Sequence, residues 1–373
     1  MASPRFNSII IILFICTISL SIVSISCKED LKTNQAALFA FGDSLFEAGN
    51  NNYFDSVSSF RSNFWPYGKT AFKFPTGRVS DGRIMIDFIA EYAWLPLIPP
   101  NLQPGYSNSQ LTYGLNFATT AAGVFAGTFP GSSKDLGTQL NNFKNVEKTL
   151  RSNLGDAEAR RVISKAVYLF HIGANDYQYP FFANTSTFSN TTKERFIDFV
   201  IGNTTTVIEE LYKLGARKFG FLSLGPFGCT PSASIIDRTK IGSCFEPVTE
   251  LINLHNQEFP RILRRLERRL SGFKYSLHDF HTSLSQRINN PSRYGFKEGK
   301  MACCGSGPLR GINSCGFRNG PSQGYELCEN ADDYVFFDPS HLTEKAHQQI
   351  AELIWSGPPN VTAPYNLKTL FRL

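Results

Sequence analysis

Short apolar segments recur along this 373-residue chain, and segments with helical periodicity alternate with them. The apolar segments lie at residues 37–41, 115–118, 166–172, 218–224 and 274–279, and the helical ones at 84–92, 138–150, 156–163, 196–214, 248–270 and 344–355. Strands that alternate with helices predict βαβ units with right-handed crossovers. We therefore expect an α/β domain built on a parallel sheet.

Small and polar residues follow the first three apolar segments. Ser44 comes just after the first, Gly123 after the second and Asn175 after the third. Because the carboxyl ends of parallel strands meet at one edge of a sheet, we expect these residues to share that edge. A serine there can act as a nucleophile if a base takes its proton and N–H donors hold the oxyanion. The alternative for Asn175 is a turn residue.

Asp338 and His341 lie three positions apart, just before the last predicted helix. A serine nucleophile needs a histidine base, and the histidine needs a carboxylate that fixes its tautomer and stabilises the imidazolium. Pro339 constrains the intervening turn, so a single loop can supply both groups. Asp-x-x-His also occurs often by chance. A histidine at the start of a helix, without a catalytic role, is therefore the alternative.

Three blocks of the sequence occur together in a characteristic order: FGDSL at 41–45, GAND at 173–176 and DPSH at 338–341. With these blocks the chain resembles the GDSL esterase/lipase family, also called SGNH hydrolases, over residues 37–355. NNN at 50–52, PTGR at 75–78 and CCG at 303–305 are similar to the plant secreted branch. The family's second block is often Asn-(Phe/Tyr)-Ala-Ser-Gly-Gly-Ala-Gly. Here it is NFATTAAG at 116–123, which retains the last glycine, Gly123.

The resemblance implies the SGNH hydrolase fold, a flavodoxin-like three-layer α/β/α arrangement with a parallel, mostly five-stranded sheet. It implies Ser44 as nucleophile, His341 as base and Asp338 as the carboxylate partner of the base. It also implies that the Ser44 N–H, Gly123 and Asn175 are the oxyanion donors. We expect no cofactor and no metal.

The N-terminal residues 1–27 have the layout of a secretory signal peptide. Arg5 precedes an apolar run at 9–23, and small residues follow it. A retained membrane anchor is the alternative, but Ser and Thr leave the run short for the roughly 20 apolar residues of a bilayer span. We expect cleavage at Ser26 or Cys27, no later membrane span, and a single domain at 28–373.

Six cysteines follow this segment: Cys229, Cys244, Cys303, Cys304, Cys315 and Cys328. An even number of cysteines in a translocated chain predicts disulfides, although the sequence leaves their connectivity open. A zinc site among the last four is the competing interpretation. It is disfavoured because structural zinc ligands usually occur in closely spaced pairs and because the secretory route is oxidising.

Glycosylation is predicted at four sequons, which begin at Asn184, Asn190, Asn203 and Asn360. The formal charge of +6 is modest for this length. The basic run at 261–269 has apolar residues at helical spacing, which favours a solvated helix face over a nucleic-acid site. His278 and His281 lack further ligands nearby in the sequence, so we interpret them as structural.

These features predict a secreted, glycosylated serine esterase or lipase that acts through an acyl-enzyme on Ser44. The Gly-x-Ser-x-Gly elbow of common lipases is absent, which disfavours the ordinary α/β-hydrolase fold. The resemblance implies a fatty-acyl or short-acyl ester as substrate, a role in plant lipid metabolism or defence, and a cell-wall or apoplast location. An acyltransferase and a catalytically quiet binding or regulatory protein are the alternatives. The sequence makes no prediction of oligomeric state.

Overall fold

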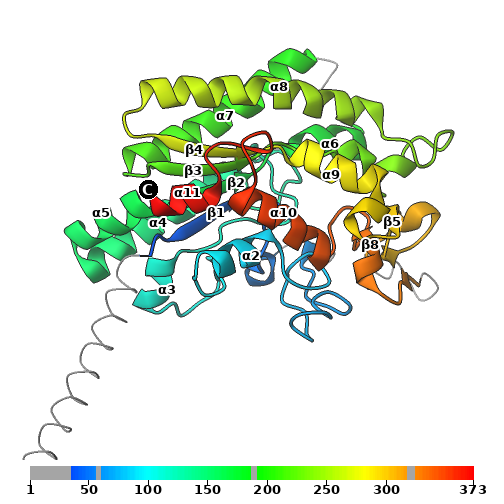
Figure 1. The fold of residues 1–373 in the computed structure, drawn as a ribbon, viewed down its shortest axis with the longest axis horizontal. Helices are drawn as coiled ribbons and strands as arrows, with labels where there is room; N and C mark the ends of the chain where they lie inside the picture. Colours follow the sequence, from blue (N-terminus) through cyan, green and yellow to red (C-terminus); the bar gives the residue numbers. More distant parts are fainter. Residues whose placement is uncertain (1–34, 56–59, 186–190, 317–323) are drawn as a thin grey trace, which may run out of the picture. The chain divides into compact units, whose positions relative to one another are not determined.

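The protein is described by a computed structural model that covers residues 35–55, 60–185, 191–316 and 324–373 (Figure 1). Residues Ala37–Leu373 form one compact unit. The predicted signal peptide at 1–27 and the predicted sequon at Asn190 lie outside the described residues. Within the described residues, no helix has both the length and the apolar character needed to cross a bilayer.

The central sheet has five strands in the order β1-β2-β3-β4-β9. The strands are β1 (Leu38–Gly42), β2 (Val167–His171), β3 (Lys218–Leu222), β4 (Lys274–His278) and β9 (Thr362–Pro364). The first four are parallel, and β9 pairs antiparallel with β4. Each parallel strand overlaps an apolar segment predicted from the sequence, so the predicted parallel architecture is confirmed.

Helices cover both faces of the sheet, as the two sides of Figure 1 show. Phe39 and Phe41 of β1 pack into one core with α4 (Leu136–Leu154), α5 (Asp156–Lys165), α7 (Lys193–Lys213) and α8 (Glu246–Arg269). Leu38 and Ala40 pack into the other with α2 (Met85–Tyr92), α9 (Phe280–Asn289), α10 (Glu344–Ser356) and α11 (Leu367–Arg372). Alternate residues of a strand point to opposite faces, so a sheet covered on both faces needs continuously apolar strands. The three-layer prediction is confirmed.

The predicted strand at 115–118 differs from the others, because it is an extended edge segment joined to β1 by a parallel bridge at Asn116. The Ala40 N–H donates to the Leu115 carbonyl at 3.1 Å, and the Phe117 N–H to the Ala40 carbonyl at 2.7 Å. The sheet still has five strands, as predicted, but the fifth is β9 and not the segment at 115–118. Three residues that include Pro364 give too short a pattern to be read as a strand.

The sequence analysis did not predict four short helices, which are α3 (Asn108–Tyr113), α6 (Ala174–Phe182), α9 and α11. The 3₁₀ helices are η1 (Asn50–Tyr53), η4 (Phe227–Cys229), η5 (Ala233–Ile235), η6 (Pro291–Tyr294), η7 (Pro308–Arg310) and η8 (Ala331–Asp333). α3 and α11 have only six residues each, and α6 has nine with Pro180 inside it, so the sequence shows no clear apolar stripe there. Their stability comes from tertiary packing.

The cysteine-rich segment forms a small subregion with two two-stranded ladders. β5 (Glu298–Ala302) pairs parallel with β8 (Tyr334–Phe336), and β6 (Cys304–Gly305) pairs antiparallel with β7 (Glu326–Leu327). Disulfides join Cys229 to Cys244, Cys303 to Cys328 and Cys304 to Cys315. The predicted pairing is confirmed, and disulfide bonds take up the four cysteines of the competing zinc interpretation.

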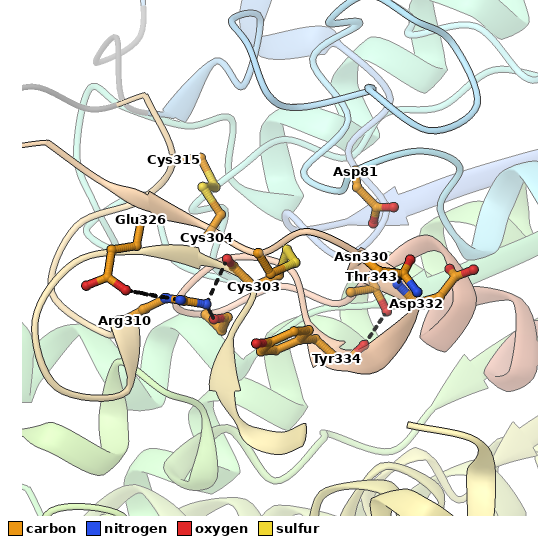
Figure 2. Close-up of a disulfide and its surroundings, with 12 residues drawn as sticks. Asp81, Cys303, Cys304, Arg310, Cys315, Glu326, Asn330, Asp332, Tyr334 and Thr343 are labelled. Carbon is orange, nitrogen blue, oxygen red and sulfur yellow. Dashed lines mark hydrogen bonds and ion pairs between the residues drawn. A yellow bond between two sulfur atoms is a disulfide. The ribbon is translucent and has the colours of Figure 1, made fainter. Parts of the chain in front are cut away.

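Arg310 stabilises this subregion from within (Figure 2). Its guanidinium donates to the carbonyl oxygens of Ala302 and Cys303 at 3.3 and 3.2 Å, and it forms an ion pair with Glu326 at 3.0 Å. The four cysteines of the subregion are buried together with Tyr67, Val79, Ala331 and Phe337. The cysteine-rich loop therefore packs as part of the core around Tyr67.

We expect the double variant Cys303→Ala/Cys328→Ala to lower the free energy of unfolding by about 2–4 kcal/mol, because this disulfide closes a loop between positions 25 apart in the sequence. Urea denaturation measures the change. Cys303→Ala alone is the matched control: it should cost at least as much and expose one new thiol at Cys328. A single variant without a new titratable thiol contradicts this pairing.

Candidate active site

Ser44 follows β1 in a tight turn at the carboxyl edge of the sheet. Gly42 has φ +155°, and a Cβ there would lie 2.3 Å from the carbonyl oxygen of His171, so only glycine fits beside β2. The side chain of Asp43 then accepts from the Leu45 N–H at 3.1 Å, and its backbone carbonyl accepts from the Phe46 N–H at 3.1 Å. These bonds fix the turn that presents the Ser44 hydroxyl.

His341 contacts both Ser44 and Asp338. Its Nε2 lies 2.8 Å from Ser44 Oγ, and its Nδ1 lies 2.7 and 2.9 Å from the two carboxylate oxygens of Asp338. When Nδ1–H donates to the carboxylate, Nε2 is left to accept the serine proton. α10 begins only at Glu344, with Thr343 as its N-cap, so His341 belongs to the loop before the helix.

Asp338 is held as an ionised group although it is buried. Burial raises the pKa of Asp338, but the charge of His341 and hydrogen bonds from His341, Tyr67 and the Ser340 N–H outweigh it, so the pKa lies below its ordinary value. The Ser340 and His341 N–H groups donate to Oδ1 at 2.9 and 2.8 Å. The carboxylate thus remains a negatively charged partner for the imidazole at neutral pH.

Asn175 lies in the first turn of α6 and lines the same cavity as Ser44 and His341. Its amide nitrogen donates one hydrogen to the Ala122 carbonyl at 2.8 Å. Gly123, in contrast, is not among the residues that line the cavity. A Cβ at Gly123 would meet Thr128 Cβ and Asp176 Oδ1, both at 2.5 Å, so this glycine permits close packing behind the loop.

Ala121, two residues before Gly123 in the same loop, lines the cavity. It has φ +66°, a left-handed conformation that is uncommon for alanine. The loop is anchored on both sides of it, because the Thr120 N–H donates to Asn51 Oδ1 at 2.9 Å and the Ala122 N–H to the Thr119 carbonyl at 3.2 Å. The alanine itself gives no signal of a positive φ, although the family block quoted above has a glycine at this position.

Asp176 attaches this loop to α6. Its carboxylate accepts from the Val124 N–H at 2.8 Å, the Phe125 N–H at 3.2 Å and the Thr128 hydroxyl at 2.6 Å. Burial raises the pKa of Asp176 to about 6 in spite of these hydrogen bonds. Neighbouring residues Asn175 and Asp176 therefore both hold the segment that contains Ala121.

The site opens into a cavity of about 370 Å³ with a mixed lining. Its large apolar residues are Phe60, Phe129, Phe182, Phe227 and Ile312, and its polar ones include Gln178, Ser232, Asn313, Ser314 and Ser340. Phe182 and Ile312 are 46% and 59% exposed. A cavity of this kind can hold an apolar chain against its aromatic side chains, with the reacting carbonyl near the polar groups.

The other predicted site residues fall outside this cavity. His278 Nδ1 pairs with Thr362 Oγ1 at 2.9 Å, and burial lowers the pKa of His278 to about 4. Asn184, Asn203 and Asn360 are exposed, as glycosylation requires. Among the described residues, no group of three or more His, Cys, Asp or Glu side chains is arranged to hold a metal ion.

Sequence reasoning missed two contacts next to the reacting groups. His171, at the end of β2, places Nδ1 3.0 Å from Asp43 Oδ1 and so supports the turn before Ser44. The Tyr67 hydroxyl donates to Asp338 Oδ2 at 2.6 Å. A histidine at the carboxyl end of a buried strand indicates a polar contact there, so the sequence could have pointed to His171. The position of Tyr67 in a long loop gives no such indication.

Comparisons with known proteins agree with this geometry. The model of the family described as GDSL-like lipase/acylhydrolase matches residues 38–354. The chain is 96% identical over 377 aligned positions, covering 100% of both chains, to GDSL esterase/lipase 4 of Arabidopsis thaliana. It is 69% identical to GDSL esterase/lipase 3 of the same plant, covering 98% of each chain, and 66% identical to GDSL esterase/lipase 2, covering 98% and 99%.

The family match covers both the turn with Ser44 and the loop with Asp338 and His341, which lie 297 positions apart in the sequence and meet in the structure. It therefore includes the four parallel strands β1 to β4 and the residues Ser44, His341 and Asp338, whereas β9 lies beyond it. The chain belongs to the GDSL-like lipase/acylhydrolase family.

Proposed function

We propose that this protein is a secreted serine esterase that hydrolyses carboxylic esters through an acyl-enzyme on Ser44. One observation carries the proposal: His341 Nε2 lies 2.8 Å from Ser44 Oγ while its Nδ1 faces the buried Asp338. A serine hydroxyl with a base and an orienting carboxylate is the arrangement that acyl transfer needs. The names of the relatives, esterase/lipase, support the same reaction class.

The reaction proceeds in two halves. His341 takes the proton of Ser44 as Oγ attacks the ester carbonyl, and the tetrahedral intermediate collapses when the imidazolium returns this proton to the departing alcohol. In the second half His341 takes a proton from water, and the hydroxide attacks the acyl-enzyme. Collapse of the second intermediate releases the carboxylic acid and restores the Ser44 hydroxyl.

Three N–H donors at the sheet edge are suited to hold the oxyanion of both intermediates. We assign the Ser44 N–H, the second amide hydrogen of Asn175 and the Ala121 N–H to this role, with Ala121 in place of Gly123. The support is that Ser44, Asn175 and Ala121 line the cavity, whereas Gly123 does not. Preorganised donors of this kind contribute several kcal/mol to transition-state stabilisation.

The substrate we propose is an ester with an apolar fatty-acyl or short-acyl chain. Phe129, Phe182 and Ile312 supply apolar surface for the acyl chain, and the cavity of about 370 Å³ limits how much of the chain is enclosed. Disulfides fit an oxidising compartment. We therefore place the protein outside the cell, in the cell wall or apoplast, and propose a role in plant lipid metabolism or defence.

Ser44→Ala should reduce hydrolysis of an acyl-ester series by at least about 10⁴-fold, because the oxyanion donors alone leave only residual catalysis. Rates across chain lengths, together with organophosphate labelling of intact protein, measure the effect. Ser164→Ala, at an exposed serine of α5, is the control and should be fully active. Normal labelling of Ser44→Ala, or turnover close to that of the control, would remove Ser44 from the mechanism.

Asp338→Asn should lower kcat by about 10³–10⁴-fold, because an amide opposite Nδ1 favours the wrong imidazole tautomer. His341→Ala should be at least as severe, since the base itself is lost. Profiles of kcat/KM against pH for both variants, with His281→Asn as a control on a histidine outside the cavity, provide the measurement. Near-wild-type profiles in both variants would mean that another group is the base for Ser44.

Asp176→Asn should change how stability depends on pH. Burial raises the pKa of Asp176 from 3.8 to about 6, so the folded state binds the proton more tightly than the unfolded state. Stability due to Asp176 is therefore full below pH 4 and falls by about 3 kcal/mol as the pH rises to 6. Urea denaturation at pH 4 to 7 should show this slope in wild type and not in the variant, and parallel curves would contradict it.

A further inference from the structure

The Tyr67 hydroxyl is an additional contact to the carboxylate that orients His341. It donates to Asp338 Oδ2 at 2.6 Å, and the tyrosine is buried, with 1% exposure. We propose that Tyr67 is a positioning residue: its hydroxyl fixes the rotation of the Asp338 carboxylate and thereby the orientation and basicity of His341. This inference rests on the proposed function, because it presumes that His341 acts as base for Ser44.

The contacts of Asp338 divide unevenly between its two oxygens. Oδ1 accepts from the Ser340 and His341 N–H groups of its own loop and lies 2.7 Å from His341 Nδ1. Oδ2 is 2.9 Å from His341 Nδ1 and receives its other hydrogen bond from Tyr67, which lies 271 positions away in the sequence. Without the tyrosine hydroxyl, a buried anionic oxygen loses a charge-assisted hydrogen bond, and Oδ2 keeps only its contact with His341, so the carboxylate is held less firmly in its rotation about the Cβ–Cγ bond.

The Tyr67 hydroxyl is arranged to act only as a donor toward Asp338. Its proton is directed at the carboxylate at 2.6 Å, and the Ser62 and Ser314 side chains act to lower its pKa, as groups that donate toward the phenol oxygen do. Burial raises the pKa of Tyr67 well above its ordinary value, and the charge of Asp338 adds to the effect. The hydroxyl therefore keeps its proton over the whole range in which an esterase is assayed.

The tyrosine ring is held by the disulfide-rich subregion. Phe64 and Phe337 each pack edge-on against it, with ring centroids 5.4 Å away. Cys303, Cys304, Cys315 and Cys328 belong to the same buried cluster, and Figure 2 shows the disulfide between Cys304 and Cys315. A rigid cluster is what a positioning residue requires, because an orienting group must itself be locked by its surroundings.

Tyr67→Phe tests the role, because it removes one hydroxyl and preserves the ring. We expect kcat on a neutral acyl ester to fall by about 10- to 100-fold with KM within about twofold, the loss expected for a hydrogen bond to a charged group. The acid limb of kcat/KM should also move to higher pH. A carboxylate with one donor fewer stabilises the imidazolium more strongly, and this raises the apparent pKa of the limb.

Tyr168→Phe is the matched control, since Tyr168 is as deeply buried as Tyr67 and its hydroxyl donates to the Ile163 carbonyl at 2.9 Å. Tyr168 lies in the core formed with α4, α5, α7 and α8, apart from the cluster around Tyr67. This variant should leave both kcat and the acid limb unchanged. Thermal unfolding of both variants shows whether they are folded. An equal loss of kcat in the two variants, or an unmoved limb in Tyr67→Phe, overturns the proposal.

A double-mutant cycle gives a second measurement. In an Asp338→Asn background, Tyr67→Phe should lower kcat by less than twofold further, because the carboxylate that it positions is gone. A full 10-fold loss in that background would assign Tyr67 a role independent of Asp338 and overturn the proposal. If Ser44→Ala stays active, the proposed function fails; if it is inactive while Tyr67→Phe matches Tyr168→Phe, only the positioning role fails.

Discussion

The contact between Ser44 Oγ and His341 Nε2 depends on most of the fold. It joins positions 297 apart at a distance of 2.8 Å, so β1 and the loop before α10 must meet within a fraction of an ångström. α10 and α2 pack in the same core as Leu38 and Ala40 of β1. The second apolar core therefore sets the distance between the nucleophile and its base, and a shift of about 1 Å is enough to cost a large part of the rate.

Buried polar groups fix the loops around this contact. Asp43, Asp176 and Asp338 each accept backbone N–H groups, so each carboxylate defines the shape of one loop at the sheet edge. Burial has a cost at Glu47, because it raises the pKa of this carboxyl to about 8 and so favours the protonated form at neutral pH. Arg78 and Asp87 form a buried ion pair at 2.7 Å, in which each charge is the partner of the other. Such preorganised loops hold the donor groups of the site in fixed positions, which is what electrostatic stabilisation of a transition state requires.

The four parallel strands and the long helices follow from local patterns that are strong enough to be read directly. A strand that is apolar at every position is buried on both faces, and α8 shows its apolar side at regular helical spacing. The short elements gave no comparable pattern. β9 has three residues and ends in Pro364, and α6 follows Gly173 with Pro180 inside it, so only packing makes these segments regular.

The sequence by itself determined the parallel sheet, the paired cysteines and the candidate residues Ser44, Asn175, Asp338 and His341, because residue type and position relative to strand ends carry that information. Only the tertiary structure decided which cysteines pair, that Ala121 and not Gly123 faces the cavity, and that Tyr67 donates to Asp338. Those outcomes depend on contacts between segments far apart in the chain and on the positive φ of Ala121. Neither has a local signal, because both are fixed by the packing of the complete fold.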